Sequence, residues 1–262
     1  MITFKYYPGG KTRALTFSFD DGLKEDILLL EIMNRYGIRG AFHLNSSLLG
    51  SDRCVSPEAV KATYKNHEVS CHSVTHPFLQ QIPQEGLITQ IFEDRINLER
   101  LTEYPVRGIS YPFGQYDKNV VTTLNVLGIE YARTVNATLD FALPADFLQW
   151  HPTCHCSQDP IGLYKQFYAS APYAHMRLYY LWGHSDEFNG KWDKMEEICK
   201  TISGNPDIWY ATNIEIVDYI KAMRSLRFTC DQSIVYNPSA ISVWIDVENK
   251  CIEVKGGETK KL

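Results

Sequence analysis

Short β-rich runs alternate with helical patterns along almost the whole chain. Residues 14–19 (ALTFSF) have the unbroken apolar character of a buried strand, and residues 24–37 (KEDILLLEIMNRYG) have helical apolar spacing that ends at a glycine. Strands separated by helices of this length imply parallel strands joined by right-handed crossovers. The same alternation predicts further strands at 40–45, 67–72, 108–112, 131–135, 146–152, 176–183 and 208–212, and helices at 57–65, 87–103, 119–128, 162–170, 191–202 and 215–225.

About eight such units predict a closed or nearly closed (β/α) barrel over residues 1–225, a distorted relative of the TIM barrel with seven or eight parallel strands. An open doubly wound sheet is the alternative. Residues 226–262 change character, because short alternating strands are interrupted by an Asn-Pro pair and a VENKC turn. This segment predicts a small β appendage packed on the barrel.

Composition narrows the function classes. With 44% hydrophobic and 22% charged residues among 262, the chain has enough apolar material for a substantial core. A net charge of −5, without a basic block before the C-terminal tail, disfavours nucleic acid as a partner. No apolar run is long enough to cross a membrane, and the N-terminus lacks the pattern of a signal peptide. We therefore expect no membrane association and a cytoplasmic location, or export if a signal peptide has been removed. Seven scattered cysteines fit a reducing compartment.

Polar residues lie where predicted strands end, which is where a parallel α/β barrel carries its functional groups. One carboxylate with two neutral imidazoles is the ligand set of a catalytic divalent metal site, and a second carboxylate is then free to act as a base. The strand ends carry Asp20 and Asp21 within TFSFDDGL, His72 and His76 within HSVTH, the SYPFG turn at 110–114, and His184 within LWGH.

Two other patterns look like metal sites but do not fit one. The run WHPTCHC at 150–156 has two His and two Cys, yet its spacing matches no zinc ribbon or finger, and neighbouring strand residues point to opposite faces. The run HEVSCH at 67–72 has its second His five positions after the first, and it reads as a strand. This run therefore does not match the HExxH motif of zinc proteases.

The elements TFSFDDG, HSVTHP, YPFG and LWGH, in this order and spacing, resemble the NodB-type polysaccharide deacetylases, carbohydrate esterase family four, from about residue 12 to residue 222. The resemblance implies a metal-dependent hydrolase that removes N-acetyl, or O-acetyl, groups from a carbohydrate with a metal-activated water. Zn²⁺ is the metal expected first, with Co²⁺, Ni²⁺ or Mn²⁺ as other candidates. The implied roles are metal ligand for Asp21, His72 and His76, general base for Asp20, and general acid for His184.

The same resemblance assigns the substrate contacts. The backbone N–H of Phe113 is implied to hold the oxyanion, and Leu181 is implied to line the pocket for the acetyl methyl group. Tyr111 and Trp150 complete the expected substrate contacts.

Two departures from the family pattern raise open questions. Ser110 stands where the family has an arginine that braces the base, so we expect either Arg107 or Arg133 to reach in, or the site to do without. The Asp-then-Trp element that orients the acid survives only loosely as DFLQW, in which Asp146 either orients His184 or caps a turn.

Two alternative functions stay open at this point. An allantoinase-like enzyme would keep the fold and the metal but hydrolyse a small non-sugar amide. An inactive carbohydrate-binding relative would keep only the scaffold. The partner is accordingly a carbohydrate or a small amide, and the sequence leaves the oligomeric state undetermined.

Overall fold

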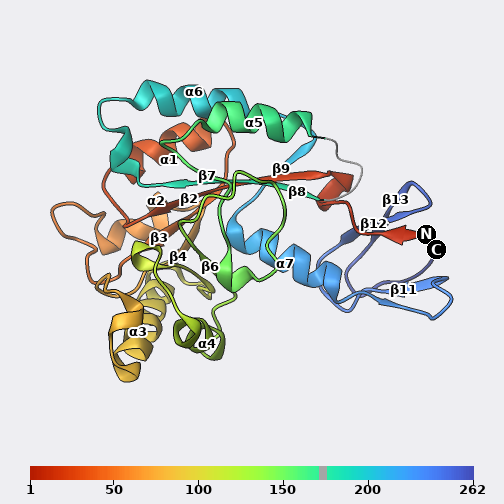
Figure 1. Cartoon of the computed structure of the whole chain (residues 1–262), viewed down its shortest axis with the longest axis horizontal. Helices are drawn as coiled ribbons and strands as arrows, with labels where there is room; N and C mark the ends of the chain where they lie inside the picture. The colour runs from red at the N-terminus through yellow and green to blue at the C-terminus, as the bar shows by residue number, and fades with distance from the viewer. Residues whose placement is uncertain (171–175) are drawn as a thin grey trace.

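The computed structural model describes residues 1–170 and 176–262, and a sheet of eight parallel strands lies at its centre (Figure 1). The strand order is β6-β5-β4-β3-β2-β8-β7, and β9 pairs with the first half of β2. The predicted parallel arrangement is thereby confirmed. The strands are β2 (Arg13–Asp20), β3 (Gly40–Leu44), β4 (Glu68–Cys71), β5 (Gly108–Ser110), β6 (Tyr131–Arg133), β7 (Cys154–His155), β8 (Arg177–Gly183) and β9 (Ile208–Tyr210).

Helices follow the strands as the sequence pattern predicts. Figure 1 shows α1, α5 and α6 together on one side of the sheet. Helices α3 and α4 lie next to each other at a different part of the sheet. Their apolar faces pack on the outer surface of the strands. The helices are α1 (Asp26–Arg35), α2 (Val60–Thr63), α3 (Gln84–Thr102), α4 (Lys118–Val126), α5 (Pro160–Ala169), α6 (Trp192–Ile202) and α7 (Asn213–Arg224).

The sheet curls, and residues 150–156 link its two end strands. The backbone of Trp150 donates to the carbonyl oxygen of Ala132 at 2.9 Å on the β6 side, and the N–H of Cys156 donates to the carbonyl oxygen of Trp182 at 2.8 Å on the β8 side. These bonds confirm the barrel-like fold class expected from the sequence. No helix of the described residues combines the length and the apolar character that crossing a membrane requires.

The prediction of a strand at 146–152 is wrong. Residues 147–149 form a short 3-10 turn, because the Asp146 side chain accepts the backbone N–H of Leu148 at 2.9 Å. Such a local side-chain bond offers the backbone an alternative to a sheet ladder. The strand of this region is instead β7, which begins at Cys154.

Alternation along β2 separates an apolar outer face from a polar interior. Phe17 and Phe19 belong to the cluster under the helices, whereas the hydroxyl of Thr16 donates to the side-chain oxygen of Asn213 at 2.8 Å. Asp20 has the same parity as Thr16 and therefore also faces the interior. The polar face of β2 thus leads to the carboxyl edge of the barrel.

Residues 226–262 form antiparallel strands beside α7. Strand β1 (Ile2–Thr3) joins this region by pairing with β12, and the two chain ends lie near each other there (Figure 1). A division at residue 225 therefore leaves one strand of the appendage in the N-terminal part of the chain. The remaining strands are β10 (Arg227–Phe228), β11 (Ile234–Tyr236), β12 (Val243–Val247), β13 (Lys250–Val254) and β14 (Thr259–Lys261).

Candidate active site

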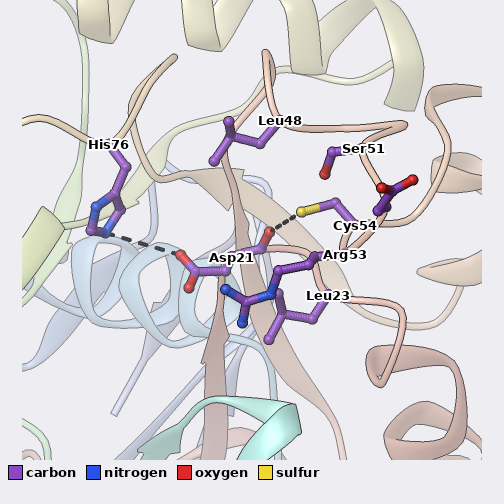
Figure 2. Close-up of a pocket in the computed structure, with 8 residues that line it drawn as sticks. Asp21, Leu23, Leu48, Ser51, Arg53, Cys54 and His76 are labelled. Carbon is purple, nitrogen blue, oxygen red and sulfur yellow. Dashed lines mark hydrogen bonds and ion pairs between the residues drawn. The ribbon is translucent and has the colours of Figure 1, made fainter.

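Asp21, His72 and His76 meet at the carboxyl edge of the barrel. The Asp21 Oδ1 atom lies 3.6 Å from the Nε2 of His72 and 4.0 Å from the Nε2 of His76. Asp21 follows β2 in the left-handed region (φ 77°), and Gly22 (φ 64°) continues the bend. This bend turns Asp21 toward the imidazoles, and Figure 2 shows its carboxylate facing His76.

These three residues fit a divalent cation. One donor atom from each lies within 4.8 Å of the others. The Nδ1 of His72 is 2.8 Å from the carbonyl oxygen of Ser110, an acceptor that requires Nδ1 to carry the proton, so the lone pair of Nε2 points to the cluster. Burial lowers the pKa of His72 more than Asp20 and Asp21 raise it, so the imidazole is neutral, as a metal ligand must be.

Asp20 occupies a different environment from its neighbour. Its Oδ2 is paired with the guanidinium of Arg133, and its Oδ1 accepts the Ser110 hydroxyl at 3.0 Å. Burial alone would raise the pKa of Asp20, but nearby positive charge, above all that of the Arg133 guanidinium, outweighs burial and holds the pKa below its usual range. Asp20 is therefore an ionised carboxylate in a buried position.

Of the two arginines considered from the sequence, the structure places only Arg133 beside Asp20. Arg107 is directed elsewhere, since its guanidinium donates to Glu130 at 3.2 Å and to Asp218 at 2.7 Å. Of the alternatives left open by the sequence, the structure therefore shows Arg133, because these two carboxylates hold Arg107 away from Asp20.

His184 follows β8 and is oriented by a residue that the sequence interpretation missed. Its Nδ1 lies 2.9 Å from the Oε1 of Glu187. Burial lowers the pKa of His184, but the bond to Glu187 and the charges of Asp20 and Asp21 raise it to about 9. The signal for Glu187 was the HxxE spacing of a capping box, which places the two side chains on one turn.

The DFLQW element does not reach His184. Asp146 caps the 3-10 turn and accepts the amide of Gln149 at 3.0 Å. Trp150 is fully buried against Tyr131 and Tyr180, so it offers no surface to a substrate. Of the two alternatives for Asp146, the structure shows the capped turn, and it leaves Trp150 no exposed surface.

Leu181 and Tyr111 also lie away from the cleft. Leu181 is fully buried in the cluster under the helices, whereas Trp182 faces inward with its ring 4.3 Å from the Arg133 guanidinium. The hydroxyl of Tyr111 donates to the carbonyl oxygen of Leu148 at 2.6 Å from a buried position. Neither side chain can line an acetyl pocket, and strand parity makes Trp182 the residue of β8 that faces the site.

Phe113 lies beside His76, one of the three candidate metal ligands. Its ring packs against His76 with centroids 4.4 Å apart and stacks on Phe78 at 4.0 Å. Its backbone is left-handed (φ 57°), and no hydrogen bond to its N–H is found among residues 1–170 and 176–262. This N–H is available to a substrate oxygen at the rim of the site.

Two further buried residues support the site and were not singled out from the sequence. Asp94 on α3 accepts the backbone N–H of His72 at 3.0 Å and that of Ser46 at 2.8 Å, and burial raises the pKa of Asp94 to about 6. His43 on β3 lies near Asp20, and burial lowers its pKa to about 3. Each reads in the sequence as an ordinary helix or strand residue.

A cleft of about 450 Å³ opens beside Asp21 and His76 (Figure 2). Its lining combines apolar and polar side chains, which suits a substrate that has both apolar and polar surface. The cleft is lined by Asp21, Leu23, Leu48, Ser51, Asp52, Arg53, Cys54 and His76.

Comparisons with known proteins identify relatives of the fold. The polysaccharide deacetylase family model matches residues 7–132. A candidate polysaccharide deacetylase from Mycobacterium smegmatis superposes with a TM-score of 0.62 at 15% identity, over 86% of this chain and 96% of that chain. A family 4 carbohydrate esterase from Streptomyces lividans, in complex with acetate, gives 0.55 at 14% identity, over 77% and 93%.

The same fold occurs in a CE4 family pseudoenzyme from Bacillus anthracis, with a TM-score of 0.53 at 17% identity, over 82% of this chain and 68% of that chain. The chain spans only 55% of a Streptococcus pyogenes deacetylase and 44% of a candidate polysaccharide deacetylase from Bacillus anthracis. No curated protein matches the chain in sequence. The match to the polysaccharide deacetylase family model, residues 7–132, covers just under half of the chain and includes Asp20, Asp21, His72 and His76.

Proposed function

We propose that the protein is a metal-dependent hydrolase that removes acetyl groups from an acetylated carbohydrate. The observation that carries the proposal is the division of the two adjacent carboxylates. Asp21 faces His72 and His76, whereas Asp20 pairs with Arg133. One carboxylate is thus available to a cation and the other to a proton.

Asp21, His72 and His76 would hold the cation, with Zn²⁺ as the first candidate for this nitrogen and oxygen donor set. A bound divalent ion supplies polarisation of the acetyl carbonyl and a lower pKa for the attacking water. The third ligand, His76, keeps its ring in place by packing against Phe113.

The side chains of the chain would move the protons. Asp20 accepts a proton from the attacking water, since Arg133 keeps it ionised. The N–H of Phe113 donates to the oxygen that becomes negative in the tetrahedral intermediate. His184 then gives its Nε2 proton to the departing amine, because Nδ1 is held by Glu187. Asp20 thus acts on the water, the Phe113 N–H on the carbonyl oxygen, and His184 on the nitrogen of the leaving group.

The proposal is tested with purified protein loaded with Zn²⁺ or left metal-free. We expect acetate release from N-acetylated oligosaccharides with metal, and at least about a hundredfold less with Asp20→Asn, the change that removes the base. Ammonia release from ureides, with no acetate from sugars, would instead indicate the small-amide function. Binding of sugars without either product would indicate an inactive relative.

A further inference from the structure

The carboxylate of Glu187 lies at the centre of four donors from two separate segments. Its Oε1 accepts from the Nδ1 of His184 at 2.9 Å and from the backbone N–H of His184 at 3.2 Å. The Nε2 of His155 is 3.1 Å from the same oxygen. The thiol of Cys156 lies 3.4 Å from Oε2. The WHPTCHC run therefore meets the turn that carries the general acid.

The hydrogen on His155 is placed by its own neighbour. The backbone N–H of Ser157 points to the Nδ1 of His155 at 3.2 Å, so Nδ1 accepts and Nε2 carries the hydrogen. The ring is further held by an edge contact with Trp182, with centroids 4.5 Å apart. His155 is thus a donor to Glu187 with a fixed orientation.

The thiol of Cys156 is also held by the local backbone. A Cβ atom added to Gly183 would lie 2.4 Å from the Sγ of Cys156, so the absence of a side chain at Gly183 makes room for the thiol beside Glu187. Burial, followed by the charge of Glu187, raises the pKa of Cys156 above its usual range, which keeps the thiol protonated as a donor.

His155, Cys156 and Glu187 resemble a metal ligand set, since their donor atoms lie within 4.8 Å of one another. The contacts, however, converge on the Glu187 oxygens: the Nε2 of His155 lies 3.1 Å from Oε1 and the thiol of Cys156 donates to Oε2 at 3.4 Å. With a hydrogen on its Nε2, His155 has no lone pair to offer there. The hydrogen-bonded arrangement explains the cluster without a cation.

We propose that Glu187 is the positioning residue of the general acid, and that His155 and Cys156 hold Glu187 in place. The inference rests on the proposed function, in which His184 protonates the leaving group. By accepting from Nδ1, Glu187 fixes the ring of His184 and directs Nε2–H toward the nitrogen. As the C–N bond breaks, its electron pair stays on the nitrogen, which takes the Nε2 proton. The neutral imidazole then recovers a proton from water.

The charged surroundings of His184 favour this role. Glu187 contacts its Nδ1 from the same turn, His155 contacts Glu187 on the other side, and the charges of Asp20 and Asp21 at the end of β2 also raise the pKa of His184. Three carboxylates stabilise the imidazolium form against the cost of burial. Among them only Glu187 contacts a ring nitrogen, so only its loss removes the orientation together with the charge.

The test compares Glu187→Gln, Cys156→Ala and His184→Ala in the zinc-loaded protein with two substrates. An N-acetylated sugar has an amine leaving group that needs a proton, whereas 4-nitrophenyl acetate has a leaving group that does not. We expect Glu187→Gln to lower kcat on the sugar about 10²-fold or more and to move the alkaline limb of the pH profile to lower pH. Hydrolysis of the aryl ester should stay within about threefold. Glu197→Gln, an exposed carboxylate on α6, is the matched control.

A Glu187→Gln protein with equal losses on both substrates, or with an unmoved alkaline limb, would overturn the positioning role. An NMR titration of the His184 imidazole in the metal-free protein gives a readout that needs no activity. A pKa and tautomer of His184 that are unchanged by Glu187→Gln would overturn the proposal even if the wild-type protein released no acetate, a result that by itself would refute only the proposed function. If the wild-type protein binds a second zinc ion and Cys156→Ala does not, the cluster is a metal site and the proposal is overturned.

Discussion

Arg133 and Asp20 form an ion pair inside the barrel although they are 113 positions apart in the chain. Arg133 is the last residue of β6 and Asp20 the last of β2, so the curl of the sheet brings their side chains together across the interior. The Ser110 hydroxyl completes the environment of Asp20 from β5. Arg133, an arginine from another strand end, thus pairs with Asp20, while Ser110 stands where the family pattern has an arginine.

Arg133→Met should leave a buried carboxylate without its counter-charge. We expect a higher pKa for Asp20, deacetylation that is lost at neutral pH and partly recovered at higher pH, and a free energy of unfolding lower by about 3–5 kcal/mol. Arg107→Met is the control, since Arg107 pairs with Glu130 and Asp218 away from the site. The two variants are compared by pH profiles and urea unfolding. Equal activity of both at pH 7 would contradict the bracing role.

Replacement of a ligand should separate metal binding from folding. His76→Ala removes an imidazole that is partly exposed, so we expect near-wild-type unfolding but zinc affinity weaker by at least about tenfold. His151→Ala is the matched control, because this imidazole bonds Thr134 outside the ligand cluster. Isothermal titration with Zn²⁺ measures both. A His76→Ala protein that still binds one zinc ion with unchanged affinity would exclude His76 as a ligand.

The fold was predictable from the sequence because strand and helix periods differ and parallel strands share one functional edge. Asp20, Asp21, His72 and His76 lie at strand ends, and the structure brings these residues together. Arg133 could be offered only as one of two candidates, since the barrel curl decides which arginine faces inward. The role of Glu187 was missed because His155 and Cys156, which hold its side chain, come from a distant segment of the chain.

The expected substrate contact Leu181 differs by one position from Trp182, the residue of β8 that faces the interior. Leu181 and Trp182 are neighbours on β8, so they necessarily point to opposite faces. The sequence motif does not show which of the two faces the interior. Pairing of β8 with β2 decides it, and it places Trp182 over Arg133.

Substitutions at these two positions should therefore have opposite effects. Leu181→Ala should lower the free energy of unfolding by about 2–5 kcal/mol with little change in KM, because it opens a cavity under the helices. Trp182→Leu should change KM and kcat for acetylated sugars more than stability, because the ring contacts Arg133 and lies near His184. Steady-state kinetics beside urea unfolding distinguishes them. A large KM effect of Leu181→Ala would restore the original assignment.

Glu68 should make the stability of the barrel depend on pH. Burial raises its pKa to about 7 from 4.5, although hydrogen bonds from the Ile214 N–H, the Tyr131 hydroxyl and the Ser70 hydroxyl lower it. The folded protein therefore retains a proton on Glu68 that the unfolded chain has lost between pH 4.5 and pH 7. The free energy of unfolding falls as pH rises through this interval, by roughly 3 kcal/mol from this group.

Glu68→Gln should remove that slope. The amide oxygen of glutamine can accept the Ile214 N–H, and its NH₂ group can donate to the two hydroxyl oxygens. The hydrogen bonds therefore survive without a titrating proton. Asp26 and Asp94 also have raised pKa values, and they stay in both proteins, so the difference between the two unfolding curves isolates Glu68. Urea unfolding of the metal-free proteins at pH 5 and pH 8 measures it, with Glu197→Gln as the exposed control. If wild type and Glu68→Gln lose equal stability between these two pH values, Glu68 is ionised in the folded barrel.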